Sequence, residues 1–164
     1  MSGRFEIRRA SAQQLPEILT VYERARRFMR ETGNPNQWSG GYPTPQLLEN
    51  DLEKGNLYVL LKGEKLCGVF ALIFGEDSTY RVIEGGTWGS DAPYAAIHRI
   101  ASSGEEHGIL EAAVCYARSR IGHIRIDTHR DNAVMQHLLI KLGFSRRGII
   151  YLPNGDPRIA FELF

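Results

Sequence analysis

The sequence predicts a layered α+β domain built around a mixed β-sheet. Two apolar runs, at 57–61 and 65–74, flank a glycine-centred turn at 62–64, a pattern that is typical of a β-hairpin. Segments before and after this hairpin carry apolar residues three and four apart, which is the spacing of one buried helix face. The segment 123–144 reads as a short strand, a polar turn and a helix that Gly143 ends.

The first half of the chain is predicted to begin with a strand and two helices. Ser11 can cap the first helix, because its hydroxyl can accept a hydrogen bond from the first helical turn. Pro45 suits the start of the second, where a missing N–H removes no helical hydrogen bond. The expected elements are a strand at 5–8, a helix from about 11 to 29, a loop at 33–45 and a helix from 44 to about 54.

The second half is predicted to alternate strands with two further helices. A turn at 153–156, with Asn and Gly at its centre, joins the last two strands. The expected elements are strands at 80–84, 94–101, 123–127, 148–152 and 158–163 and helices at 108–120 and 133–142. The complete order, β-α-α-β-β-β-β-α-β-α-β-β, describes a sheet with helices packed against it.

Composition sets bounds on the class of protein. A chain of 164 residues is expected to form a single domain, 1–164. The net charge of +1 gives no field that favours nucleic acid or an acidic membrane, and no apolar run is long enough to span a bilayer. Cys67 and Cys115 match no metal-binding spacing and are expected to be buried, reduced thiols. A cytoplasmic location without a metal is the default expectation.

The segment 94–144 contains the most informative spacings. Gly108 comes before one predicted helix, Asn132 comes before the next, and Gly143-Phe144 ends that helix and starts a strand. With these spacings the segment resembles the second half of the GNAT-type acyl-CoA N-acyltransferases. The resemblance implies a three-layer fold, a mixed and mostly antiparallel sheet of about six or seven strands with helices on both faces.

In the resembling family, the backbone of a Gln/Arg-x-x-Gly-x-Gly/Ala loop binds the pyrophosphate of coenzyme A at a helix start. Unpaired N–H groups and the helix dipole favour an anion there. The corresponding loop is 105–110, where only Gly108 matches and Glu105 replaces the cationic or amide residue. Glu105 must therefore point away or be offset by nearby Arg or Lys. The resemblance implies acetyl-CoA as co-substrate, with contacts from Arg99, Ile100, Ser102, Glu106, His107, Gly108, Ile109, Leu110 and Asn132.

The strand before this loop is implied to bind the pantetheine arm and to polarise the thioester carbonyl through a backbone N–H. In a regular strand, successive side chains point to opposite faces of the sheet. Alternation would put His98, Ile100 and Ser102 on one face and Arg99 and Ala101 on the other.

An amine must lose a proton before or during its attack on a thioester, so a base that works near neutral pH is expected. His98 is the first candidate, because an imidazole titrates near pH 6.5 and His98 adjoins the presumed thioester site. Glu84 and Asp127 are the next candidates. Each residue also has a structural alternative. His98 can be a paired core histidine, Glu84 a solvated glutamate, and Asp127 part of an Asx turn before a helix. Leu139 stands where the family often has a tyrosine that protonates the departing thiolate, so another group must do so or the thiolate leaves as such.

The glycine-rich loop between the first two helices carries two aromatic residues, Trp38 and Tyr42. Large aromatic side chains on a loop are costly to expose, which favours a cleft wall or a dimer contact. In the resembling family this loop borders the acceptor pocket, so both residues are expected to bind substrate. The alternative is that Trp38 only pins the loop to the core, and Trp88 poses the same choice.

The resemblance implies an N-acetyltransferase that moves the acetyl group of acetyl-CoA to a primary amine by direct attack. The acceptor would be a small-molecule or peptide amine, not a nucleic acid, and the aromatic-rich last strands are compatible with a homodimer. The sequence leaves two alternatives open. One is a non-catalytic acyl-CoA-binding or regulatory module, which the degenerate loop and Leu139 favour. The other is an interaction domain without a ligand.

Overall fold

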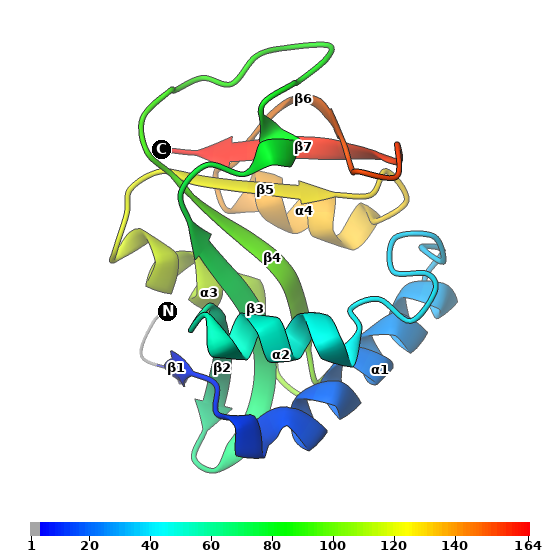
Figure 1. Cartoon of the computed structure of the whole chain (residues 1–164), viewed down its shortest axis with the longest axis vertical. Coiled ribbons are helices and arrows are strands. Elements are labelled where there is room, and N and C mark those ends of the chain that lie inside the picture. The colour runs from blue at the N-terminus through cyan, green and yellow to red at the C-terminus, as the bar shows by residue number, and fades with distance from the viewer. Residues whose placement is uncertain (1–3) are drawn as a thin grey trace.

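The computed structural model of the protein describes residues 4–164, which form one mixed sheet with helices packed on both faces (Figure 1). The seven strands lie in the order β1-β2-β3-β4-β5-β7-β6. The strands are β1 (Glu6–Arg9), β2 (Leu57–Lys62), β3 (Lys65–Phe74), β4 (Ala95–Ser102), β5 (Ile124–Thr128), β6 (Ser145–Tyr151) and β7 (Pro157–Leu163). The helices are α1 (Leu15–Glu31), α2 (Pro45–Glu53), α3 (Ile109–Arg118) and α4 (Ala133–Lys141), with short 3-10 turns η2 (Ala12–Gln14) and η3 (Ser78–Tyr80).

Every pair of neighbouring strands is antiparallel except β4 and β5, which are parallel. The connection between these two strands runs through α3, as a parallel connection requires. The predicted fold class, a mixed and mostly antiparallel sheet with helices on both faces, is therefore confirmed.

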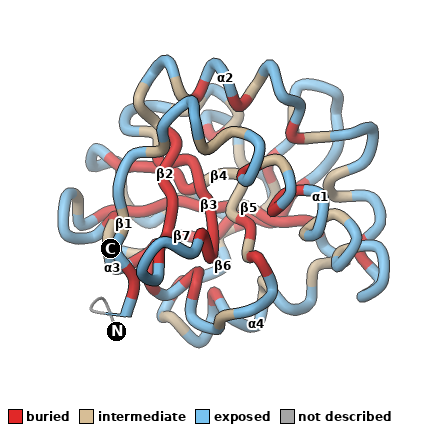
Figure 2. Tube along the Cα trace, turned by 90° about the horizontal axis from the view of Figure 1, so that it is seen from below, coloured by how far each residue is buried: buried red, intermediate tan, exposed pale blue. Residues whose placement is uncertain are grey.

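The sheet separates two core layers, one between each of its faces and the helices that cover that face (Figure 2). On one face, Ile18 of α1 and Leu48 of α2 pack with Val59 of β2. On the other face, Leu60 of β2 packs in the cluster that includes Ala113 of α3. Because both faces are covered, β2 and β3 bury nearly every residue, and this explains their continuous apolar runs.

β4 contains a β-bulge. Ala101 pairs with Val69 but His98 pairs with Ala71, so β4 has one more residue than β3 between these two pairs. Arg99 lies at this bulge with a φ of 53°. The extra residue reverses the alternation: His98 lies opposite Ala71, which is in the α1/α2 core, whereas Ile100 packs against the α3/α4 core. The prediction that His98 and Ile100 share a face is therefore wrong.

β4 and β5 are paired only at their N-terminal ends. They pair only at Ala95 with Ile124 and at Ala96 with Arg125. Beyond these pairs the two strands diverge, which Figure 1 shows as a widening opening between β4 and β5. The backbone of each strand along the opening is thereby released from pairing with the other.

The predicted strand at 80–84 is wrong. The segment instead begins with the 3-10 turn η3, and within it only Glu84 makes a ladder contact, an isolated bridge to Ile149 of β6. Tyr80 is buried because its ring packs against Trp88 and Tyr94, with centroid distances of 5.4 and 6.2 Å. Ile83 is partly buried in the same cluster, whereas Val82 is exposed, so the apolar residues of this segment do not form the face of a strand.

Two predictions of burial need correction. In α4, Leu139 is buried, but Val134 and Leu138 are exposed, because the apolar residues surround the helix and only one side of it reaches the core. Cys67 is buried as expected, whereas Cys115 lies on the exposed side of α3. Among residues 4–164, no helix combines the length and the apolar character needed to cross a membrane.

Candidate active site

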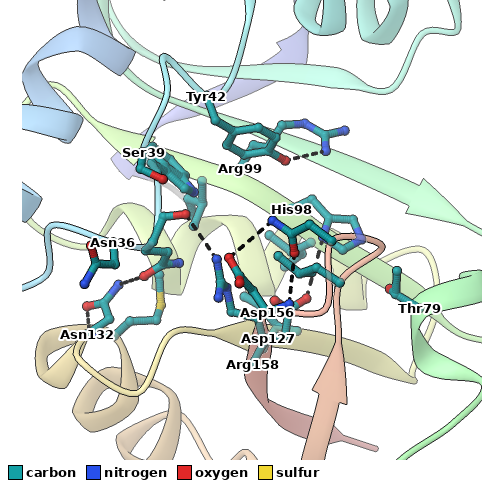
Figure 3. A pocket seen from close by; sticks show the side chains of 18 of the residues that line it. Asn36, Ser39, Tyr42, Thr79, His98, Arg99, Asp127, Asn132, Asp156 and Arg158 are labelled. Carbon is teal, nitrogen blue, oxygen red and sulfur yellow. Dashed lines mark hydrogen bonds and ion pairs between the residues drawn. The ribbon is translucent and has the colours of Figure 1, made fainter.

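A cavity of about 560 Å³ opens where β4 and β5 diverge (Figure 3). It is bounded by the bulged part of β4, the end of β5, the start of α4, the loop after α1 and the β6–β7 hairpin. The polar residues that line it are Asn36, Gln37, Ser39, Tyr42, Asp77, Thr79, His98, Arg99, Asp127, Asn132, Asn154, Asp156 and Arg158. The cavity therefore brings together polar groups from both halves of the chain.

His98 is held by a carboxylate that sequence reasoning missed. Its Nε2 lies 2.8 Å from Oδ2 of Asp77, and its Nδ1 lies 4.0 Å from Oδ2 of Asp127. Asp77 also accepts hydrogen bonds from the backbone N–H and the hydroxyl of Thr79, at 2.9 and 2.6 Å. Burial alone would raise the pKa of Asp77, but the hydrogen bonds from His98 and Thr79 outweigh it and hold this pKa well below its usual range.

His98 comes just before the bulge, and regular pairing with Ala71 puts it on the α1/α2 side of the sheet. There the segment that leads into η3 brings Asp77 against it. A cap signal at 77–79 was visible in the sequence, since Asp, Ser and Thr are typical of helix starts. That signal does not indicate a partner 21 residues away.

Asp127 is the second carboxylate beside His98. It accepts a hydrogen bond of 2.6 Å from the hydroxyl of Tyr80. Burial, together with the nearby charge of Asp127, raises the pKa of Tyr80 well above its ordinary value, so this hydroxyl remains a donor. Of the three predicted bases, the structure thus brings His98 and Asp127 together in the cavity.

Glu84 is not part of this cavity. Its side chain is exposed and accepts a hydrogen bond of 2.8 Å from Tyr151. The bridge to β6 holds its backbone beside the far edge of the sheet. Trp88 also lies elsewhere: its indole N–H donates to the carbonyl of Tyr80 at 2.8 Å, and its ring packs on Tyr80.

Arg99 points its side chain toward α2. Its guanidinium forms a two-bonded ion pair with Asp51, at 3.0 and 2.9 Å, and donates to the hydroxyl of Tyr42 at 3.3 Å. Its carbonyl accepts a hydrogen bond of 2.7 Å from Tyr22. Arg99 therefore anchors the bulge to α1 and α2, and any contact of its side chain with a ligand would compete with Asp51.

Trp38 and Tyr42 line the cavity as predicted for the loop after α1. Trp38 also packs edge-on against Tyr22, with a centroid distance of 5.7 Å, and lies 6.3 Å from Tyr42. The two readings of Trp38 are therefore compatible, because one face of the ring can pin the loop while the residue borders the cavity.

Asn132 caps α4 and ties it to the loop after α1. Its Oδ1 accepts a hydrogen bond of 3.0 Å from the backbone N–H of Met135, and its Nδ2 donates to Oε1 of Gln37 at 2.9 Å. The same oxygen of Gln37 accepts from the amide of Asn34 at 2.9 Å. Sequence reasoning placed Gln37 in this loop but did not indicate this link, which joins residues 95 positions apart.

The start of α3 has the features of an anion site. Gly108 precedes the helix with a φ of 84° and offers no side chain to cap it. Glu105 and Glu106 are both engaged in ion pairs. The pairs are Glu105 with Lys65 and with Arg24 (3.5 Å), and Glu106 with Arg4 (2.6 Å) and with Lys62 (3.1 Å). Four cations thus surround two carboxylates, so the expected offset of Glu105 is present.

The other predicted coenzyme contacts differ in what their side chains do. Ile109 and Leu110 are buried in the α3 core, which leaves only their backbone available to a ligand. The hydroxyl of Ser102 accepts a hydrogen bond of 3.0 Å from the backbone N–H of Gly104. His107 is exposed beside the helix start. Within residues 4–164, no group of three or more His, Cys, Asp or Glu could hold a metal ion.

No family model matches the chain, and no curated protein matches its sequence. Solved structures do match. A GNAT-family acetyltransferase from Streptococcus agalactiae is 28% identical, with a TM-score of 0.90 over 100% of this chain and 97% of that one. A GNAT-family acetyltransferase from Listeria monocytogenes is 19% identical, with a TM-score of 0.71 over 96% of this chain and 93% of that one.

These likenesses cover 96 to 100% of this chain. At 19% identity a likeness shows the fold alone, and the match at 28% identity supports acetyltransferase chemistry in general terms. The seven-stranded sheet with its parallel β4–β5 pair, together with these matches, shows that the chain has the fold of the GNAT-type acyl-CoA N-acyltransferases.

Proposed function

We propose that this protein is an acetyl-CoA-dependent N-acetyltransferase that acts on a primary amine. The observation that carries the proposal is the contact of 2.8 Å between His98 and Asp77 in the cavity beside the β4 bulge. Because Asp77 stays ionised, it can only accept, and the neutral imidazole must therefore carry its proton on Nε2. Nδ1 then has the free lone pair that a general base needs.

The coenzyme would bind across the opening between β4 and β5. The uncapped start of α3 and the surplus of cations around it suit a pyrophosphate. The bulge at Arg99 takes part of β4 out of regular pairing with β3, which frees backbone groups near Ile100. One of these N–H groups would stabilise the negative charge that develops on the thioester oxygen.

The proposed reaction needs no covalent intermediate on the protein. His98 takes one proton from the acceptor ammonium, the amine nitrogen bonds to the acetyl carbon, and the bond from that carbon to sulfur breaks, while the second proton of the nitrogen passes to water. Leu139 is wholly buried and has no proton to give, so the sulfur leaves as a thiolate. Asp127, fixed by Tyr80, lies 4.0 Å from Nδ1 of His98, the atom that would take the proton, and would help to attract an ammonium there.

The second candidate is a coenzyme-binding module that transfers nothing. Leu139 favours it, because the resembling family often has a proton donor at this position. Binding of acetyl-CoA without release of free thiol in the presence of any amine would distinguish this module from an enzyme.

The first test is calorimetric titration of the protein with acetyl-CoA, using Gly108→Asp and its neutral counterpart Gly108→Asn. Both side chains tolerate a positive φ, and a Cβ at Gly108 would have no atom within 3.4 Å, its nearest neighbour being Arg4 at 3.9 Å. Asp also favours a helix start, so unfolding would not explain weaker binding. A carboxylate facing a pyrophosphate should weaken binding by roughly tenfold relative to Asn.

Equal affinities of the Asp and Asn variants for acetyl-CoA would show that the coenzyme does not bind at the start of α3. No binding of acetyl-CoA by the unaltered protein would overturn the proposed function. With binding established, release of free thiol in the presence of a panel of amines tests transfer itself.

A further inference from the structure

Arg158 is a buried cation in the cavity that has no carboxylate partner among residues 4–164. It lies near the start of β7, is 6% exposed and lines the same cavity as His98. Its guanidinium donates to the carbonyl of Pro157 at 2.9 Å and to the carbonyl of Gln37 at 3.2 Å. Within residues 4–164, no carboxylate oxygen lies within 4.0 Å of it.

Arg99, the other arginine of the cavity, is different because Asp51 already neutralises it. A guanidinium has five N–H donors, and two carbonyl contacts leave donors of Arg158 for a ligand. Burial lowers the pKa of Arg158, and the more distant charges of Asp127 and Asp156 do not offset this. A buried cation in this condition is stabilised by an anion that enters the cavity.

The opposite end of the cavity suits the amine. Asp77 and Asp127 flank His98, so a positively charged nitrogen would be attracted there before it loses its proton. Asp127 lies near both ends, because it is 4.0 Å from His98 and its charge acts on Arg158. Figure 3 shows His98, Asp127 and Arg158 around one cavity, whose volume of about 560 Å³ is enough for a small molecule.

We propose that the acceptor is an amine that carries a carboxylate in the same molecule, as a free amino acid does, and that Arg158 binds this carboxylate while the amine faces His98. The planar guanidinium can bind both oxygens of a carboxylate at once. Asp127 and Asp156 would disfavour a doubly charged phosphate in the same position. This inference rests on the proposed N-acetyltransferase function and narrows its substrate class.

The test compares L-amino acids with their α-amides as acceptors. Each amide keeps the amine and the side chain but has no negative charge. The unaltered protein should prefer the acid, and the ratio of kcat/KM for acid to amide should fall roughly 10- to 100-fold in Arg158→Gln. Arg158→Lys should keep part of the preference. Arg146→Gln, which removes an exposed arginine from the same hairpin, is the matched control and should keep all of it.

A purely structural role for Arg158, as an anchor for Gln37, would lower the rates with acid and amide alike. That result would overturn the inference, as would an unaltered protein that prefers amides or plain amines. Calorimetric binding of the standard L-amino acids is measured as well, because it does not depend on transfer. If the protein binds amino acids, Arg158→Gln abolishes this binding, and the protein does not bind acetyl-CoA, then the carboxylate site is supported and the transferase function is refuted. If acetyl is transferred only to plain amines, the transferase function is supported and the carboxylate site is refuted. A protein that neither binds nor acetylates any amino acid would also refute the carboxylate site.

Discussion

At the scale of single residues, the surroundings of His98 select one tautomer. An ionised carboxylate only accepts hydrogen bonds, and Asp77 has its pKa held low by His98 and Thr79 against the effect of burial. The proton of neutral His98 therefore stays on Nε2, and the lone pair stays on Nδ1. Asp77 is thus a positioning residue, which acts on the reaction through His98.

We expect His98→Gln to lower kcat by about 10²- to 10⁴-fold, the usual contribution of a general base. Asp77→Asn should have a smaller effect on kcat and should also shift the acid limb of the kcat/KM profile to lower pH. The reason is that a neutral amide no longer stabilises the protonated imidazole. Rates measured between about pH 5 and pH 9, a range that brackets the ordinary pKa of a histidine, would show the shift.

Asp91→Asn removes an exposed carboxylate that does not line this cavity and should leave the profile in place. An Asp77→Asn profile that coincides with that of the unaltered protein would show that Asp77 does not act through His98. A loss of activity that follows a loss of folded protein, seen by circular dichroism, would make the role structural.

The same residues show what a single sequence can and cannot predict about a site. His98 and Asp127 were predicted because residue type and position near strand ends are local properties. Asp77 and Arg158 were missed, since nothing local marks them as neighbours of His98. Glu84 was predicted from a strand that does not form, and its carboxylate meets Tyr151 instead.

At the scale of elements, the bulge in β4 needs support from outside the sheet. Arg99 adopts a positive φ and its side chain reaches α2, where Asp51 is buried. Tyr22 of α1 holds the carbonyl of Arg99. These contacts hold the bulge, and therefore His98, against both helices on this face.

We expect Arg99→Ala to destabilise the protein by about 3–5 kcal/mol, because it leaves Asp51 as an unpaired buried charge. The double variant Arg99→Ala/Asp51→Ala removes both charges and should lose less stability than the sum of the two single variants. Urea unfolding of all four proteins measures this coupling. Additive losses would mean that the ion pair does not hold the bulge, and Arg27→Ala, on the exposed surface of α1, serves as the control.

Elements differ in how well sequence predicts them, for physical reasons. The hairpin and the helices were predicted because apolar periodicity and turn residues are local features of the sequence. The bulge was not predicted, because it is a property of the pairing between β4 and β3. The periodicity of the β4 sequence carries no information about that pairing. The strand predicted at 80–84 does not form, because Tyr80 is buried from a 3-10 turn and Val82 is exposed, so the apolar residues do not mark a strand face.

At the scale of the whole molecule, one buried carboxylate joins the strands of the second half. Glu162 of β7 contacts His123 at 2.6 Å and Arg147 at 2.8 Å, with Arg125 at 3.6 Å. It also accepts a hydrogen bond of 2.7 Å from the backbone N–H of Gly89. A single side chain thus ties β5, β6 and the loop before β4 to β7, the strand that carries Arg158.

Burial would raise the pKa of Glu162, but the hydrogen bonds from Gly89 and His123 and the charges around it hold that pKa below its usual value. A group whose pKa is lower in the folded state stabilises the protein above its unfolded pKa, about 4.3 for Glu. This stabilisation is lost as the pH falls through the folded pKa. The free energy of unfolding should therefore decline as the solution is acidified below about pH 4.

Glu162→Gln should lower the free energy of unfolding by about 3–5 kcal/mol at neutral pH, because His123, Arg125 and Arg147 lose their shared anion. Its acid decline should also be shallower than that of the unaltered protein, since the carboxylate responsible is gone. Urea unfolding across a pH series measures both effects, with the exposed Glu64→Gln as control. Equal stability at neutral pH together with an unchanged acid slope would mean that the surrounding cations are satisfied elsewhere, and β7 would then be held by its strand pairing and its apolar face.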